Sequence, residues 1–271
     1  MPADPSVVVT SRQNPRFKAA LALRDGGERR KSGRLLVDGG REITMALGAG
    51  VDVIEAWVAP DEIRTDAAHR ALVALAAAGA TIVEAEPELL RRLAYGDRSD
   101  GVVAVVARPE TALAALALSD DPLIAVVDRV EKPGNLGAVM RSADGAGVDA
   151  IIATDPVSEP WNPNAIRASL GTIFSLPFAV ASATETLALL RERSVTIVTA
   201  RVDAATTYTD ADLGGATAIV VGSENAGLGS DWDAADITPL HIPMLGRADS
   251  LNVSASAAIL LYEARRQRSA R

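Results

Sequence analysis

The chain has 271 residues, enough for two compact domains, and it is 48% hydrophobic but only 3% aromatic. A core must therefore be built from Ala, Val, Leu and Ile, which favours layered α/β packing. There is no cysteine, so disulfides and thiolate metal sites are excluded. We find neither a secretory signal pattern at residues 1–10 nor a run of about 18 uncharged apolar residues, and we therefore expect a soluble, cytoplasmic protein.

Charge is distributed unevenly along the chain. The net charge of −8 argues against a general polyanion binder, because phosphate contacts require Lys and Arg. Residues 12–34, however, contain eight basic and two acidic residues, a net charge of +6, so the rest of the chain carries −14. This asymmetry fits a local RNA-binding face on an acidic body. A solvated amphipathic helix explains the same run equally well.

The first part of the chain predicts a small α/β domain over residues 1–108. Short β-branched runs alternate with Ala- and Leu-rich stretches, which predicts strands at 51–58, 81–85 and 102–107 and helices at 66–78 and 87–93. The next segment contains two prolines and an acidic pair. We therefore predict a linker at 109–122.

The second part, residues 123–271, predicts a larger α/β domain. Its patterns indicate strands at 123–128, 149–153, 195–199, 216–221 and 238–242 and helices at 135–146, 163–173, 184–193 and 252–267. This alternation implies a mostly parallel sheet that binds ligands at the carboxyl ends of its strands. Small residues flank the apolar stripe of the last helix, so another helix can approach it closely.

Three segments that follow predicted strands carry the candidate chemistry. PGNLG at 133–137 contains Asn135, which can cap a helix whose later turn presents Arg141. IVVGSENAGL at 219–228 places a glycine at a strand end and Glu224 in the turn after it. The third segment, 242–264, has Ser250 and Asn252 at the mouth of the last helix. Ordinary turns and caps explain each segment alone, and none is the G-x-G-x-x-G dinucleotide pattern.

Together, these segments closely resemble the three motifs of the SpoU (TrmH) family of RNA ribose 2′-O-methyltransferases, within the SPOUT superfamily. The resemblance covers residues 123–271, and residues 11–43 also resemble the start of the substrate-recognition domain of many members. It implies a C-terminal α/β trefoil-knot methyltransferase domain, which periodicity cannot show. It also implies a homodimer that packs through the catalytic domain.

The resemblance further implies the cofactor S-adenosylmethionine and a set of site residues. Cofactor contacts fall on Gly222, Ile242 and Leu251, with Met244, Thr199 and Ala200 as neighbours. Catalytic positions fall on Arg141, Asn135, Glu224, Ser250 and Asn252. A guanidinium does not lose its proton in proteins, so we interpret Arg141 as an electrostatic stabiliser of the developing alkoxide and leave the base unassigned. The only histidines, His69 and His241, lack metal-ligand spacing, and we expect no metal.

RNA contacts are expected in two places. The segment NPNAIRASLGTIFSLP at 162–177 resembles the family's phosphate-contacting region, which points to Arg167 and Ser169. In the basic N-terminal run the expected contacts are Arg12, Lys18, Arg29, Arg30 and Lys31. The recognition domain favours ribosomal over transfer RNA as substrate. Three alternatives are a transfer-RNA 2′-O-methyltransferase, a non-catalytic RNA-binding assembly factor on the same fold, and an unrelated nucleotide-binding α/β protein.

Overall fold

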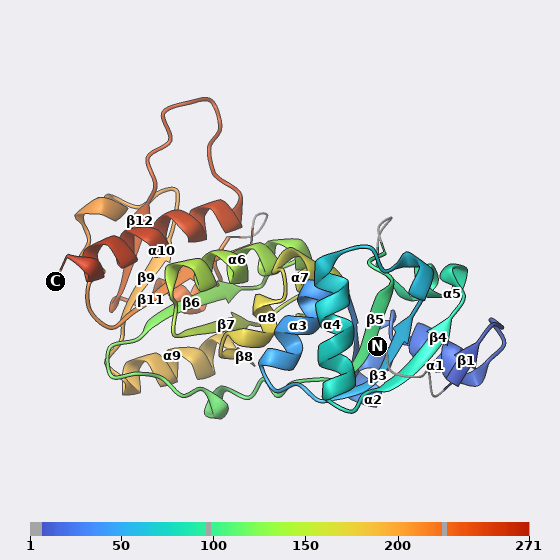
Figure 1. Cartoon of the computed structure of the whole chain (residues 1–271). Helices are drawn as coiled ribbons and strands as arrows, with labels where there is room; N and C mark the ends of the chain where they lie inside the picture. Colours follow the sequence, from blue (N-terminus) through green and yellow to red (C-terminus); the bar gives the residue numbers. More distant parts are fainter. Residues whose placement is uncertain (1–6, 96–98, 224–226, 271) are drawn as a thin grey trace. The chain divides into compact units, whose positions relative to one another are not determined.

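The computed structural model describes residues 7–95, 99–223 and 227–270, and it contains two compact units (Figure 1). Unit 1 comprises Met1–Pro109 and Trp161–Ser175, and unit 2 comprises Glu110–Pro160 and Leu176–Arg271. The segment Trp161–Ser175 thus groups with unit 1, although in the chain it lies between two strands of unit 2. The sequence-based domain limits did not anticipate this assignment.

Unit 1 is a five-stranded mixed sheet with helices. The strand order is β1-β4-β3-β5-β2, with bounds β1 (Val7–Val9), β2 (Arg34–Asp38), β3 (Val53–Val58), β4 (Thr81–Ala85) and β5 (Val102–Ala107). β5 runs antiparallel to both β2 and β3, and the other pairs are parallel. Its first five helices are α1 (Pro15–Ala22), α2 (Gly26–Ser32), α3 (Gly40–Gly48), α4 (Asp66–Ala77) and α5 (Pro87–Leu93).

The segment that joins unit 1 from the middle of the chain was predicted as one helix over 163–173, and this is wrong. The structure has two short helices, α7 (Pro163–Ala168) and α8 (Thr172–Ser175). Leu170 and Gly171 separate them with φ of +54° and +85°. Two successive residues in the left-handed region cannot continue a right-handed helix, so the chain turns there.

Unit 2 is built on a seven-stranded sheet in which every neighbouring pair is parallel, which confirms the predicted mostly parallel sheet. The order is β10-β12-β9-β11-β6-β7-β8, with bounds β6 (Leu123–Asp128), β7 (Ala150–Thr154), β8 (Phe178–Ala181), β9 (Thr196–Ala200), β10 (Thr206–Thr207), β11 (Thr217–Val221) and β12 (Ile237–His241). The short strands β8 and β10 were not predicted.

Three helices pack on this sheet, α6 (Pro133–Ala146), α9 (Ala183–Glu192) and α10 (Val253–Ser269). The first and last lie side by side, and Arg265 Nε of α10 donates to the Ala146 carbonyl at 2.7 Å (Figure 1). This close packing agrees with the small residues along the flank of α10. No helix within the described ranges is both long and apolar enough to cross a bilayer.

The segment predicted as a linker lies along unit 2. Thr111 O accepts a hydrogen bond from Val180 N of β8 at 2.8 Å, which covers the outer edge of that strand. Leu113, Leu116 and Leu118 pack against the apolar core of unit 2. Short 3-10 turns occur here and elsewhere, at Leu113–Ala115, Pro60–Glu62, Tyr208–Asp210 and Ser230–Asp233.

Candidate cofactor and active site

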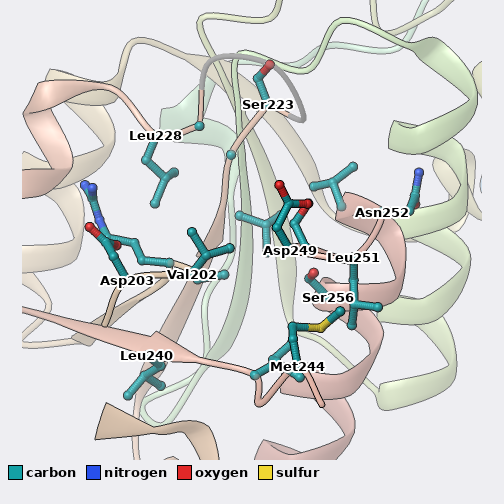
Figure 2. A pocket seen from close by; sticks show the side chains of 18 residues that line it. Val202, Asp203, Ser223, Leu228, Leu240, Met244, Asp249, Leu251, Asn252 and Ser256 are labelled. Carbon is teal, nitrogen blue, oxygen red and sulfur yellow. The ribbon is translucent and has the colours of Figure 1, made fainter. Parts of the chain in front are cut away.

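A cavity of about 590 Å³ opens at the carboxyl ends of β9, β11 and β12, three neighbouring strands of unit 2 (Figure 2). Its walls are the segments that follow these strands together with the first turns of α10. The volume is in the range of small-molecule sites, and the position is where open parallel sheets bind ligands. This is the site at which the sequence placed a cofactor.

Gly222, directly after β11, forms a wall of bare backbone. A Cβ at this position would lie 2.7 Å from the carbonyl carbon and oxygen of Gly227 and 2.8 Å from Leu228 N. Carbon atoms in ordinary contact are about 3.5–4.0 Å apart, so no larger residue fits without moving the facing backbone. The glycine therefore keeps the two sides of this turn close together beside the cavity.

The remaining lining combines apolar side chains with two carboxylates. In Figure 2, Val202 and Leu228 lie on one side of the cavity and Met244 and Leu251 on the other. Asp203 and Asp249 add acidic groups. Such a lining suits a ligand that has a flat apolar part and a polar or cationic chain.

The six predicted cofactor residues do not all line this cavity. Gly222, Ala200, Ile242, Met244 and Leu251 do. Thr199 lines a separate cavity of about 290 Å³ instead. Successive side chains of a strand point to opposite faces, which is consistent with Ala200 and Thr199 of β9 lining different cavities.

Two of the predicted catalytic residues are brought together although 117 positions separate them in the chain. Asn252 Nδ2 donates to Asn135 Oδ1 at 3.3 Å. Asn252 also caps α10, because its Oδ1 accepts from Ser254 N at 2.9 Å. One asparagine thus both begins α10 and joins it to the start of α6.

Of the other three predicted catalytic residues, the structure describes two. Ser250 lines the cavity next to Asn252. Arg141 is exposed on α6, and no described residue forms a hydrogen bond or ion pair with its side chain. Glu224 lies outside the described residues.

Known proteins match the chain over both units. The SpoU rRNA Methylase family model matches residues 122–262, which is more than half of the chain, and a model described as an MRM3-like substrate binding domain matches 14–104. The chain belongs to the SpoU rRNA methylase family.

Similar proteins and structures extend over nearly the full length of this SpoU protein. A 23S rRNA (guanosine-2'-O-)-methyltransferase RlmB of Burkholderia sp is 36% identical over 86% of the chain and 96% of its own. A crystal structure of an RNA 2'-O ribose methyltransferase is 39% identical, covers 97% of this chain and 100% of its own, and superposes with a TM-score of 0.85. AviRb from Streptomyces viridochromogenes, in complex with AdoMet, is 30% identical over 95% of this chain and 99% of its own, with a TM-score of 0.84.

The SpoU motifs rest on two anchors that sequence reasoning missed. Asp128, at the end of β6 and 1% exposed, accepts from Thr154 Oγ1 at 2.8 Å and from Gly229 N at 3.1 Å. Ser223 Oγ donates to Glu131 Oε1 at 2.7 Å. Both ends of the turn that follows β11 are therefore tied to the segment that precedes α6. An aspartate at the end of an apolar strand run is the sequence signal that could have identified Asp128, because a carboxylate buried there needs hydrogen-bond partners.

Among the basic residues of unit 1, Arg29 is not an RNA contact, which corrects the prediction. Its side chain is buried, with the residue 2% exposed, and Nη1 donates to the carbonyls of Leu23 and Arg24 at 2.9 and 2.8 Å. Burial and backbone bonding keep this guanidinium away from a phosphate. Arg30 and Lys31 are exposed on α2 and remain available.

The other predicted RNA contacts differ in how exposed their side chains are and in the groups that they bond. Arg12 is exposed and paired with Glu88, and Lys18 Nζ donates to Gln13 Oε1 at 2.6 Å. Ser169 is fully buried, with Oγ donating to the Ile166 carbonyl at 2.7 Å. A buried serine that closes a helical turn cannot meet RNA, so the prediction for Ser169 is wrong. Arg167 is 38% exposed at its side chain.

The described part of the chain holds no group of three or more His, Cys, Asp or Glu side chains arranged to bind a metal ion.

Proposed function

We propose that this chain transfers the methyl group of S-adenosylmethionine to the 2′-hydroxyl of a ribose in ribosomal RNA. The observation that carries the proposal is the convergence of the SpoU segments on one cavity, beside the bonded pair Asn135 and Asn252. Relatives that match almost the full chain support the substrate class, among them a 23S rRNA (uridine(2479)-2'-O)-methyltransferase of Streptomyces viridochromogenes that is 31% identical over 96% of the chain.

The cavity suits this cofactor. Its apolar side chains, including Leu228 and Leu251, can enclose an adenine ring, and the bare backbone of Gly222 can approach it closely. Asp203 and Asp249 offer acceptors for ribose hydroxyls or for the ammonium group. When bound, the cofactor supplies an electrophilic methyl group on a sulfonium.

Protein side chains have two tasks in this reaction, alignment of the ribose and stabilisation of negative charge on its oxygen. Asn135 and Asn252 fix the junction of α6 and α10, so groups presented by the two helices keep a constant separation. Arg141 stabilises the hydroxyl oxygen as its proton leaves, since a guanidinium stays charged throughout. Ser250 and Glu224 hold the ribose, and an RNA phosphate is the proposed proton acceptor.

Substitution of Arg141 tests the assignment directly. We expect Arg141→Ala to abolish methyl transfer to a ribosomal RNA fragment while binding of S-adenosylhomocysteine, measured by calorimetry, changes less than about twofold. Arg193→Ala, which removes an exposed arginine of unit 2 away from the cavity, is the matched control. Equal loss of transfer and of cofactor binding would contradict the catalytic role.

The substrate is tested in cells. Mapping of 2′-O-methylated nucleotides in ribosomal and transfer RNA, with and without the gene, should show one ribosomal position that loses its methyl group. Loss at a transfer-RNA position alone would overturn the ribosomal assignment. We place the enzyme in the cytoplasm, where this substrate is made.

A homodimer that packs through unit 2 belongs to the same proposal. Large apolar side chains stand exposed on the segment after β12 and on α10, with Leu245 99% and Tyr262 52% exposed. Large exposed apolar side chains are candidates for burial in a subunit interface. Light scattering should give twice the chain mass, and Leu245→Glu should lower it; a monomeric wild type would contradict the proposal.

A further inference from the structure

The segment Trp161–Ser175 is fastened to unit 1 by close contacts. α7 packs on β2, and α8 packs on α3. Gly171, with φ of +85°, sits so close to α3 that a Cβ would lie 2.8 Å from Met45 Cβ. Trp161 and Phe174 stack with ring centroids 5.6 Å apart, so the two ends of the segment pack against each other. The backbone that carries Arg167 is therefore fixed by packing against the rest of unit 1.

Asp38, at the end of β2, holds the Arg167 side chain. Its Oδ2 accepts from Arg167 Nη1 at 3.0 Å and from Tyr95 N at 2.9 Å. The residue is 5% exposed, and its Oδ1 is buried without a hydrogen-bond partner among the described residues. In contrast, 38% of the Arg167 side chain is exposed. One nitrogen of the guanidinium is thus bonded to a buried carboxylate, while more than a third of the side chain stays open to solvent.

The charges around this pair are mainly acidic. Asp100 acts electrostatically on Asp38, and Asp38 acts in turn on Glu42 of α3; Arg167 is the cation acting on Asp38 within the described ranges. Burial raises the pKa of Asp38, and hydrogen bonds from Tyr95 and Arg167 oppose that rise. A buried carboxylate beside two other acids is costly unless a cation neutralises it, and the ion pair with Arg167 offsets this cost for Asp38.

We infer that Asp38 is a positioning residue that aims the free edge of the Arg167 guanidinium at an RNA phosphate. The inference rests on the proposed function, in which Arg167 contacts RNA. A planar guanidinium has five donors, so bonding one nitrogen to Asp38 leaves a fork for phosphate oxygens. Holding the side chain in one orientation also reduces the rotamer freedom that is lost when RNA binds.

Positioning by Asp38 and simple electrostatics predict opposite changes in RNA affinity when the Asp38 carboxylate is removed. Removing a carboxylate beside an RNA-binding arginine removes repulsion, and charge alone would tighten RNA binding. If Asp38 positions Arg167, Asp38→Asn should instead weaken binding of a ribosomal RNA fragment by about three- to tenfold. Glu86→Gln, which removes an exposed carboxylate of unit 1 with no capping bond, measures the charge effect alone.

The experiment compares Asp38→Asn, Arg167→Ala and the double variant by RNA affinity across a salt series, with S-adenosylhomocysteine affinity and unfolding midpoints measured in parallel. We expect the double variant to bind RNA as Arg167→Ala does, and cofactor affinity to stay unchanged. Tighter RNA binding by Asp38→Asn, or additive losses in the double variant, would overturn the inference. Arg167→Ala with wild-type RNA affinity would overturn the RNA contact itself, whereas a wild type inactive on RNA would refute the proposed function.

A second variant keeps the test decisive if Asp38→Asn does not fold. Arg167→Lys retains the charge and can still pair with Asp38, but its single ammonium cannot bond the carboxylate and a phosphate through one planar fork. We expect it to fold and to bind RNA about three- to tenfold more weakly than the wild type. Wild-type RNA affinity of Arg167→Lys would show that any cation suffices and would refute positioning by Asp38.

Discussion

Gly222→Ala is the substitution whose effect on the cavity can be worked out most directly. The new methyl group would meet Gly227 backbone atoms at 2.7 Å and Leu228 N at 2.8 Å. These separations are about 0.7–1.3 Å shorter than an ordinary contact, so the facing backbone must move by a comparable distance. Overpacking of this kind typically costs about 1–3 kcal/mol. Because about 1.4 kcal/mol is a tenfold change in affinity, a cost expressed fully in the cavity weakens binding about 5- to 150-fold.

Titration calorimetry with S-adenosylhomocysteine measures this loss without requiring RNA or turnover. Gly246→Ala is the matched control, since it lies in the segment between β12 and α10 and its Cβ would meet no atom within 4 Å. We expect the control to keep wild-type affinity and a wild-type unfolding midpoint, and Gly222→Ala to show weakened affinity together with a lowered midpoint. Binding by Gly222→Ala within about twofold of the wild type would refute the argument that this turn needs a bare backbone.

Four further substitutions probe the stability, the RNA surface and the pH dependence of the enzyme. Asn252→Ala removes the cap of α10 and the bond to Asn135, so we expect a loss of about 1 kcal/mol, a midpoint lowered by about 2–4 °C in thermal melts, and impaired methyl transfer; an unchanged midpoint would contradict the capping role. Arg29→Ala should cost about 2 kcal/mol or more in urea unfolding while the salt dependence of RNA binding stays unchanged, because its guanidinium bonds buried carbonyls. Lys31→Ala should leave stability unchanged and lower the slope of log affinity against log salt by about one. The opposite pattern for the two variants would show that Arg29, not Lys31, contacts RNA. Burial raises the pKa of Glu42 above 4.5, so the folded chain binds that proton more tightly than the unfolded chain does. The resulting stabilisation is complete below the unfolded pKa and is lost as pH rises through the folded pKa; Glu42→Gln should therefore flatten the fall in unfolding free energy as pH rises above 4.5, and parallel curves for the two proteins would exclude this account.

The sheet of unit 2 and most of the cavity could be predicted because their signals are local. Buried parallel strands are continuous apolar runs, and Leu123–Asp128 was predicted with the bounds that β6 has. The residues that follow such strands gather at one edge of the sheet, so Gly222 and Ile242 share a cavity as expected. The trefoil knot came only from the family resemblance, because threading of a chain leaves no periodic pattern.

The relations that the sequence could not supply concern the direction of a side chain or the packing partner of a segment. Arg29 belongs to a run of mostly exposed basic residues, and only its place on α2 turns it toward the carbonyls of Leu23 and Arg24, just after α1. Thr199 adjoins Ala200 in sequence but faces the other side of the sheet. The grouping of Trp161–Ser175 with unit 1 depends on contacts with α3 and β2 more than a hundred positions away. None of these relations is encoded in a local pattern.

The anchors around β6 explain how distant motifs act as one site. β6 lies between β11 and β7 in the sheet, so residues at its end reach both neighbours. Asp128 bonds Thr154 on one side and Gly229 on the other, while Glu131 holds Ser223. A few residues later the chain enters α6, where Asn135 meets Asn252 of the third motif. The stretch from Asp128 to Asn135 is thus bonded to both the second and the third segment, and these bonds help to set the relative placement of the segments that line the cavity.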